Sequence, residues 1–289
     1  MRKMPLKRNA MSNYYLFCTP NPDYIRHASP ELEKLSKFYP ALGTQQQAEA
    51  EQHWLVRRLQ NQKHQHFEAL AQKLKECRNE APCKSLVCPH CRRERDLSLL
   101  YAWQPLLTAS VGYVGVTLFF NLEKHSRLPW KHADKANDDI RSFKQRISRV
   151  LKRQGCASPA IGTFSLLRHL LEEHEEDIIW LPQLCLLLPN DNSLLKGLQD
   201  HMSRGGGSYI DSFIINAPFA KLKCKDPVKL LSCALDPMWR SVKSSLADGN
   251  ELHKSRIDTL KGKTLTKSLL TLDTLGTNAL SFIYGDQPK

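Results

Sequence analysis

Four of the nine cysteines in this chain fall within the short stretch ECRNEAPCKSLVCPHCRRER, residues 76–95. They are Cys77, Cys83, Cys88 and Cys91. Zinc binds four nitrogen or sulfur ligands in a tetrahedron, and the C-P-H-C sequence offers two thiolates from a single turn. Clustered cysteines favour a metal over the evenly spread disulfides of small secreted proteins. The spacing therefore predicts a bound Zn²⁺ with a structural role, because no catalytic acid is indicated beside it.

The first two cysteines are spaced more widely than in common zinc fingers, so a histidine is an alternative fourth ligand. The candidates are His64, His66 and His90. Three arginines follow the last cysteine at once, namely Arg92, Arg93 and Arg95. Cations at these positions would offset the charge of a tetrathiolate, and we predict that they contact nucleic-acid phosphates.

A second stretch of chemical interest is IIWLPQLCLLLP, residues 178–189. The alternation in its first half places Gln183 and Cys185 on one face of a strand before the sequence becomes wholly apolar. Histidines at this spacing would bind a divalent cation. Glutamine offers only a neutral amide oxygen and cysteine a soft thiol, which are poor ligands for Mg²⁺. Gln183 and Cys185 are therefore poor candidates for binding a hard cation.

The segment RSFKQRISRVLKR, residues 141–153, carries six basic side chains and no acidic one. Apolar residues Phe143, Ile147 and Val150 recur at helical spacing, which predicts a helix with one buried side and a basic outer face. We predict that the basic residues contact phosphates. They are Arg141, Lys144, Arg146, Arg149, Lys152 and Arg153.

The whole chain is basic, with 42 Lys and Arg against 29 Asp and Glu and a net charge of +13. This balance favours a polyanionic partner, and we expect DNA, double- or single-stranded, together with other proteins of a nucleoprotein complex. No apolar run reaches the roughly 18 residues of a membrane-spanning helix, and the basic first residues lack the apolar core of a secretory signal. We therefore expect a cytoplasmic protein that does not bind membranes.

Four segments are expected from the distribution of proline, glycine and apolar residues. Residues 1–43 are predicted to be an extended arm, and 44–105 a helical segment that carries the zinc knuckle. Within it, residues 44–76 form one long amphipathic helix or two stacked ones, and 96–107 a short helix. Residues 106–250 are predicted to be an α+β domain, and 251–289 a basic C-terminal tail or short helices.

The α+β domain is predicted to follow the order β–α–β–β–α–β–α. Its expected strands are 111–121, 160–171, 178–189 and 208–219, and its expected helices are 132–155, 193–207 and 226–249. Asp226 and Pro227 suit the cap and first position of the last helix. This order is typical of a ferredoxin-like antiparallel sheet with helices on one face.

Over roughly residues 77–245 the chain resembles the rolling-circle plasmid replication initiators of the HUH endonuclease superfamily. The resemblance rests on the cysteine knuckle followed by arginines, the strand VGVTLFF, the basic helix and the Trp-Pro strand from Trp180 to Leu188. It implies an HUH-type sheet. In that family, histidines on the Trp-Pro strand hold a divalent cation, and a tyrosine on a later helix attacks the DNA and stays linked to it.

The family's functional residues are absent. Its histidines correspond to Leu181, Gln183 and Cys185, and its tyrosine corresponds to Cys233. A thiolate attacks phosphodiesters poorly and would here lack its metal. The resemblance therefore implies an inactivated endonuclease that binds DNA. We expect it to act in recognition or recruitment for the replication or transposition of a mobile element, associated with the bacterial nucleoid or a plasmid.

Two alternatives stay open. The first is an active metal-dependent single-strand nickase or initiator with a rearranged site that uses Tyr209 or Cys233. The second is an adaptor or RNA-binding subunit of a larger nucleoprotein complex on the same sheet.

Overall fold

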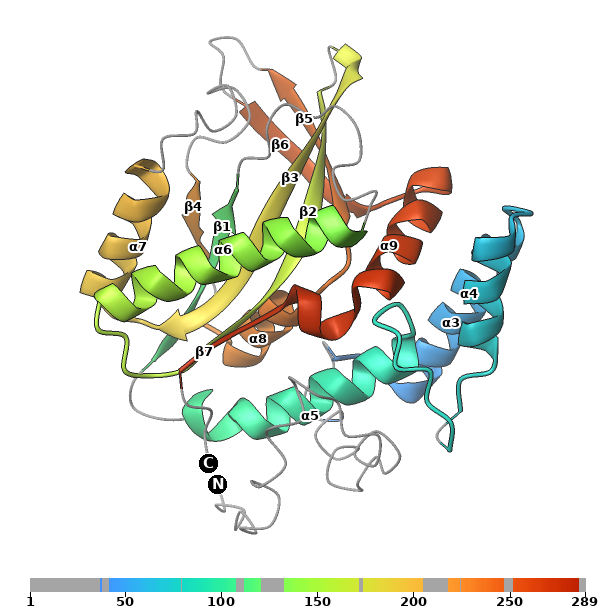
Figure 1. Ribbon diagram of the computed structural model, residues 1–289, viewed down its shortest axis with the longest axis horizontal. Coiled ribbons are helices and arrows are strands. Elements are labelled where there is room, and N and C mark those ends of the chain that lie inside the picture. The colour runs from blue at the N-terminus through green and yellow to red at the C-terminus, as the bar shows by residue number, and fades with distance from the viewer. Residues whose placement is uncertain are drawn as a thin grey trace.

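The computed structural model describes residues 37, 42–78, 80–107, 112–120, 133–171, 174–204, 218–223, 225–246 and 252–285 (Figure 1). These residues form an α+β structure with seven helices around a curled mixed sheet of seven strands. Three predicted features fall mainly or wholly outside them: the arm at 1–43, the strand at 208–219 and Tyr209.

Two stacked helices, α3 (Gln45–Gln60) and α4 (Gln65–Lys75), occupy the segment for which one or two helices were expected. Thr44 begins α3 with a capping box, in which its side chain accepts from the backbone of Gln47 and the Gln47 side chain accepts from the backbone of Thr44. The chain reverses at Lys63, whose φ of 46° lies in the left-handed region. Leucines of both helices are buried in the main core.

The strands follow the order β4-β1-β3-β2-β5-β6, with β7 paired to β2 beside this path. Their bounds are β1 Tyr113–Phe119, β2 Ala160–Leu171, β3 His174–Pro189, β4 Phe219–Lys221, β5 Arg240–Leu246, β6 Leu252–Thr259 and β7 Ser281–Tyr284. The pair β2–β5 is parallel and every other pair is antiparallel. The prediction of a wholly antiparallel sheet was therefore wrong at this pair, because β5 and β6 extend the sheet beyond the predicted strands.

Helices cover both faces of the sheet, whereas the sequence predicted helices on one face. The main core joins alternate residues of β1, β2 and β3 to α6 (Ala133–Arg153), α7 (Asn192–Arg204) and α9 (Gly262–Leu280). A second core joins Ile161 and Leu187, on the opposite face, to α5 (Pro89–Leu107) and α8 (Pro227–Leu235). Figure 1 shows α6 in front of the sheet, α9 beside it and α8 behind it.

The helix predicted at 226–249 ends early. Asp226 caps α8 as expected, accepting from the backbone N–H groups of Val228 and Lys229. The helix stops at Leu235 because Asp236 precedes a proline, which forces it into an extended conformation with a ψ of 108°. The chain then enters β5, which pairs with β2.

Residues 252–285 belong to the fold, where a tail or short helices were expected. They form β6, α9 and β7. Leu269 and Leu272 of α9 and Phe282 of β7 are buried in the main core. The apolar stripe of α9 is interrupted in sequence by lysines and threonines, which lie at the positions between the leucines.

Candidate metal centre and the face of the sheet covered by α8

The four cysteines come together in space, and we call them the cysteine cluster. Their sulfur atoms all lie within 4.8 Å of one another. The Sγ of Cys91 is 3.6 Å from that of Cys77 and 3.8 Å from that of Cys83. A tetrahedral zinc with Zn–S bonds of about 2.3 Å separates its sulfurs by roughly 3.8 Å, so the cluster has the size of a four-thiolate site.

Three local elements position these sulfurs. Cys77 follows the C-terminus of α4, and a tight turn closed by backbone hydrogen bonds between Arg78 and Ala81 returns the chain to Cys83. Cys88 and Cys91 lie at the start of α5, which begins at Pro89, a residue favoured in the first helical position. The prediction of a short helix at 96–107 thus missed the first two turns of α5, which carry Cys91 and directly follow Cys88.

Hydrogen bonds and burial make the cluster suited to a metal. The backbone N–H of Cys83 donates to the Sγ of Cys77 at 3.4 Å, a contact that orients and stabilises a thiolate ligand. A side-chain hydrogen bond with Cys83 lowers the pKa of Cys77, whereas one with Cys77 raises the pKa of Cys91. Without a cation, four thiolates this close cannot all ionise. A bound metal removes that conflict.

None of the histidines considered as alternative ligands belongs to the cluster. His90 instead shares a hydrogen bond of 3.2 Å between its Nδ1 and the side-chain nitrogen of Gln45. His64 caps α4 through the backbone N–H of His66. The four cysteines could therefore bind a metal together, and they form the one group of this kind within the described ranges.

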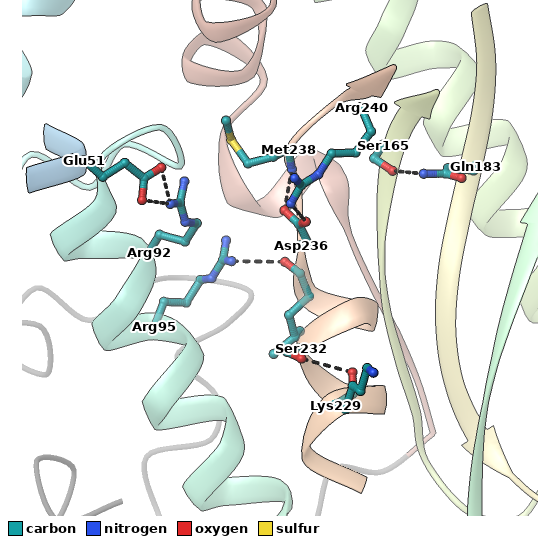
Figure 2. Close-up of polar contacts among 11 residues, drawn as sticks. Glu51, Arg92, Arg95, Ser165, Gln183, Lys229, Ser232, Asp236, Met238 and Arg240 are labelled. Carbon is teal, nitrogen blue, oxygen red and sulfur yellow. Dashed lines mark hydrogen bonds and ion pairs between the residues drawn. The ribbon is translucent and has the colours of Figure 1, made fainter. Parts of the chain in front are cut away.

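The three arginines after the cluster are held within the protein. Arg92 donates to both carboxylate oxygens of Glu51 on α3 at 2.8 Å. Arg93 is buried and donates to the backbone oxygen of Gly43 at 3.3 Å. Arg95 binds Asp96 at 2.6 Å and the backbone oxygen of Leu235, at the end of α8, at 3.2 Å. Figure 2 shows Arg92 and Arg95 reaching from α5 in these two directions. They thus join α5 to α3 and α8.

Gln183 and Cys185 lie on β3, between β1 and β2, with their side chains half-buried. The side-chain nitrogen of Gln183 donates to the hydroxyl of Ser165 at 2.9 Å (Figure 2). The thiol of Cys185 contacts the hydroxyl of Thr117 at 3.8 Å. Burial raises the pKa of Cys185 to about 12, so the thiol is neutral at physiological pH. Leu181, two residues before Gln183, is buried.

Helix α8 packs over this same face of the sheet. It contacts β1, β2 and β3, and its leucines share the second core with Leu187, which alternation places on the face of Gln183 and Cys185. Gly115 of β1 permits the close approach, because a Cβ there would lie 2.7 Å from a methyl of Leu230. Cys233 is exposed on α8, and its charge contributes to the raised pKa of Cys185.

Neighbouring polar groups on this face are engaged with one another. Asp236 accepts from the guanidinium of Arg240 at 2.6 Å and from the backbone N–H of Met238 at 2.9 Å.

The sequence analysis did not single out Ser165 or Thr117, which contact Gln183 and Cys185. Their hydroxyls interrupt largely apolar runs of β1 and β2, but only the structure shows that Thr117 pairs with Cys185 and Ser165 with Gln183.

The basic residues of α6 divide into two groups. The first group is exposed on the outer face, as expected, and consists of Arg141, Arg149, Lys152 and Arg153. Lys144 donates to the backbone oxygen of Asn278 on α9 at 2.8 Å, and Arg146 donates to His201 on α7 at 3.1 Å. The apolar residues Phe143, Ile147 and Val150 are buried, as predicted.

These features define an α+β protein with a candidate metal centre formed by four cysteines. Comparison of the chain with family models, with curated proteins and with solved structures gave no match. None of its helices, in the ranges the structure describes, is long and apolar enough to cross a membrane.

Proposed function

We propose that this protein binds DNA on an inactivated replication-initiator scaffold of the HUH type and acts in recognition or recruitment for a mobile element. The unit β1–α6–β2–β3–α7–β4 supports this scaffold. Its strands lie in the order β4-β1-β3-β2 with antiparallel neighbours, an arrangement typical of the ferredoxin-like split β-α-β fold. The further strands β5 to β7 are additions to that unit.

The observation that carries the proposal is the position of α8 relative to β3. In the family that the sequence resembles, the metal-binding strand and the nucleophile helix must face each other. Here the strand with Gln183 and Cys185 is central in the sheet, and α8 with Cys233 packs over the same face. The packing of α8 over the face of β3 that carries Gln183 and Cys185 is the contact that supports comparing these two segments with the strand and helix of that family.

The chemistry of this face favours recognition over cleavage. Gln183 is bound to Ser165, Leu181 is buried, and Cys185 is a neutral thiol. A hard cation that polarises a phosphate requires oxygen or imidazole ligands. These groups supply instead a packed interface between β3 and α8.

DNA binding is supported by the outer cations of α6 and by the net charge of +13. Four exposed cations extend along the outer side of α6, where they can contact successive phosphates, and they are Arg141, Arg149, Lys152 and Arg153.

We further propose that the cysteine cluster binds zinc. Its role would be structural, because it connects α4 to the start of α5 and thereby orients the helices packed against the sheet.

A combined cleavage and binding assay tests this function. The full chain is incubated with labelled single-stranded and duplex DNA, with and without Mn²⁺. We expect no nicking and no covalent adduct, but binding whose affinity falls steeply with salt concentration. Metal-dependent nicking with a protein–DNA adduct would contradict the proposal, and Cys233→Ala and Tyr209→Phe variants would then identify the nucleophile. Binding to RNA alone would favour the adaptor or RNA-binding alternative.

A further inference from the structure

Trp54 on α3 is unusually exposed for its residue type. Its exposed fraction is 43%, and only Ile257 is comparable among the large apolar residues that the structure describes. The rest of α3 is well anchored, since Leu55, Val56 and Leu59 are buried in the main core. An exposed indole on a firmly packed helix presents a rigid aromatic surface to solvent.

The helical neighbours of Trp54 are cationic. Arg57 and Arg58 follow at the i+3 and i+4 positions and are exposed, so they share its face. The guanidinium of Arg58 lies 5.5 Å from the centroid of the Trp54 ring. Glu51 is the acidic residue at i−3, and both of its carboxylate oxygens accept hydrogen bonds from Arg92. Trp54, Arg57 and Arg58 together form a surface that we call the aromatic platform.

We propose that Trp54 stacks a base of single-stranded DNA while Arg57 and Arg58 contact the adjacent phosphates. An aromatic face beside cations is the combination by which proteins bind single strands, because every base has a π-face and every linkage a charge. A duplex keeps its bases stacked on one another and cannot offer one to an indole on a helix surface. This inference rests on the proposed DNA-binding function and specifies one contact surface for it.

The aromatic platform is connected to the cysteine cluster. Arg92 follows Cys91 directly on α5, and its ion pair with Glu51 attaches α3 to that helix one turn before Trp54. Loss of the metal should therefore disturb the position of the platform as well as the local fold.

The test compares two ligands of roughly twelve nucleotides, an oligo-dT and an abasic deoxyribose-phosphate chain of equal length. Trp54→Ala should weaken oligo-dT binding about tenfold and leave the abasic ligand unaffected, whereas Trp54→Phe should retain most of the affinity. Arg57→Gln with Arg58→Gln should weaken both ligands. Lys75→Gln, which removes an exposed cation at the end of α4, is the matched control and should change neither.

Thermal melts first establish that the variants are folded. Because Trp54 is exposed, its replacement should leave the fold intact. If the wild-type chain binds neither ligand nor duplex DNA, the proposed function and this inference both fail. If the wild type binds oligo-dT and Trp54→Ala binds it equally well, only the inference fails. An oligo-U chain of the same length serves as a further ligand. If Trp54→Ala weakens binding to oligo-U but not to oligo-dT, the assignment to DNA is overturned. If Trp54→Ala weakens binding to the abasic chain as much as to oligo-dT, the stacking role is overturned.

Discussion

Gln183 and Ser165 face each other across the β2–β3 pair, and the side-chain nitrogen of Gln183 donates to the Ser165 hydroxyl at 2.9 Å. Ser165 is 1% exposed, so this hydroxyl depends on the protein for its hydrogen bond. The sequence pattern suggested Gln183 as the position of a metal ligand. Its side chain instead forms a hydrogen bond with Ser165 that is part of the fold.

We expect Gln183→Ala to lower the free energy of unfolding by about 1 kcal/mol, because the buried hydroxyl of Ser165 loses its partner. Ser165→Ala should cost less in the Gln183→Ala background than in the wild type, since no hydrogen bond remains to be broken. Urea denaturation of the two single variants and the double variant measures this coupling. Additive changes in the free energy of unfolding would show that the hydrogen bond contributes nothing to stability. We expect the affinity for DNA to be the same in all three variants as in the wild type.

The cysteine cluster should hold one zinc ion per chain, detected by elemental analysis of the purified protein. Cys91→Ser should abolish this zinc and lower the midpoint of thermal unfolding, because the ends of α4 and α5 lose their connection. Cys156→Ser is the matched control, since Cys156 is a free thiol outside the cluster that donates to the backbone oxygen of Ser158. Full zinc content in Cys91→Ser would show that this sulfur is not a ligand.

Arg95 should matter for stability more than for DNA contact. Its side chain is 12% exposed and that of Asp96 18%, and Arg95 also binds the last carbonyl of α8. Arg95→Met leaves a largely buried carboxylate without this partner, which we expect to cost about 2 kcal/mol in denaturant unfolding. Arg95→Met with Asp96→Asn should recover part of that loss. A stable Arg95→Met variant with weakened DNA binding would instead assign Arg95 to the phosphate-contacting surface.

The two groups of cations on α6 predict different effects on DNA affinity. Replacing Arg149, Lys152 and Arg153 by glutamine should weaken binding. The slope of log affinity against log salt should fall by roughly 0.7 to 0.9 for each phosphate that is no longer neutralised. Lys144→Gln should leave the slope unchanged, because its ammonium group binds the Asn278 carbonyl of α9. A slope that falls equally in Lys144→Gln would contradict this division.

The parts of the fold that local patterns specify were predictable. The strand at 160–171 matches β2, the helix at 132–155 contains α6, and Asp226 caps α8. The cysteine cluster also follows from spacing, because four thiols within one short stretch have few other uses.

Long-range pairing was not predictable in the same way. The parallel contact of β5 with β2, and the return of β7 to the other half of β2, depend on residues far apart in the chain. The same holds for Arg92, Arg93 and Arg95, whose spacing indicates only a basic cluster. Their acceptors in other elements come from distant segments, and they are Glu51, Gly43 and the carbonyl of Leu235.

Thiol reactivity separates Cys185 from Cys233 and tests the chemistry of the β3–α8 face. Cys233 is exposed, whereas burial raises the pKa of Cys185 to about 12, with a smaller opposing effect of its contact with Thr117. Because the thiolate is the reacting form, Cys185 should be alkylated by iodoacetamide far more slowly than Cys233 at about pH 8. Well below pH 12 its rate should rise by about tenfold per pH unit, because the thiolate fraction grows by that factor.

Mass spectrometry of the alkylated peptides measures both rates in one sample, and we expect a cysteine cluster that holds zinc to stay unalkylated. Unfolding the protein in denaturant should bring the two rates together, because Cys185 then loses the burial that raises its pKa. Fast alkylation of Cys185 in the folded chain would mean that it exists as an accessible thiolate. Such a group could bind a soft metal opposite α8, and the inactive character proposed for this face would then be wrong.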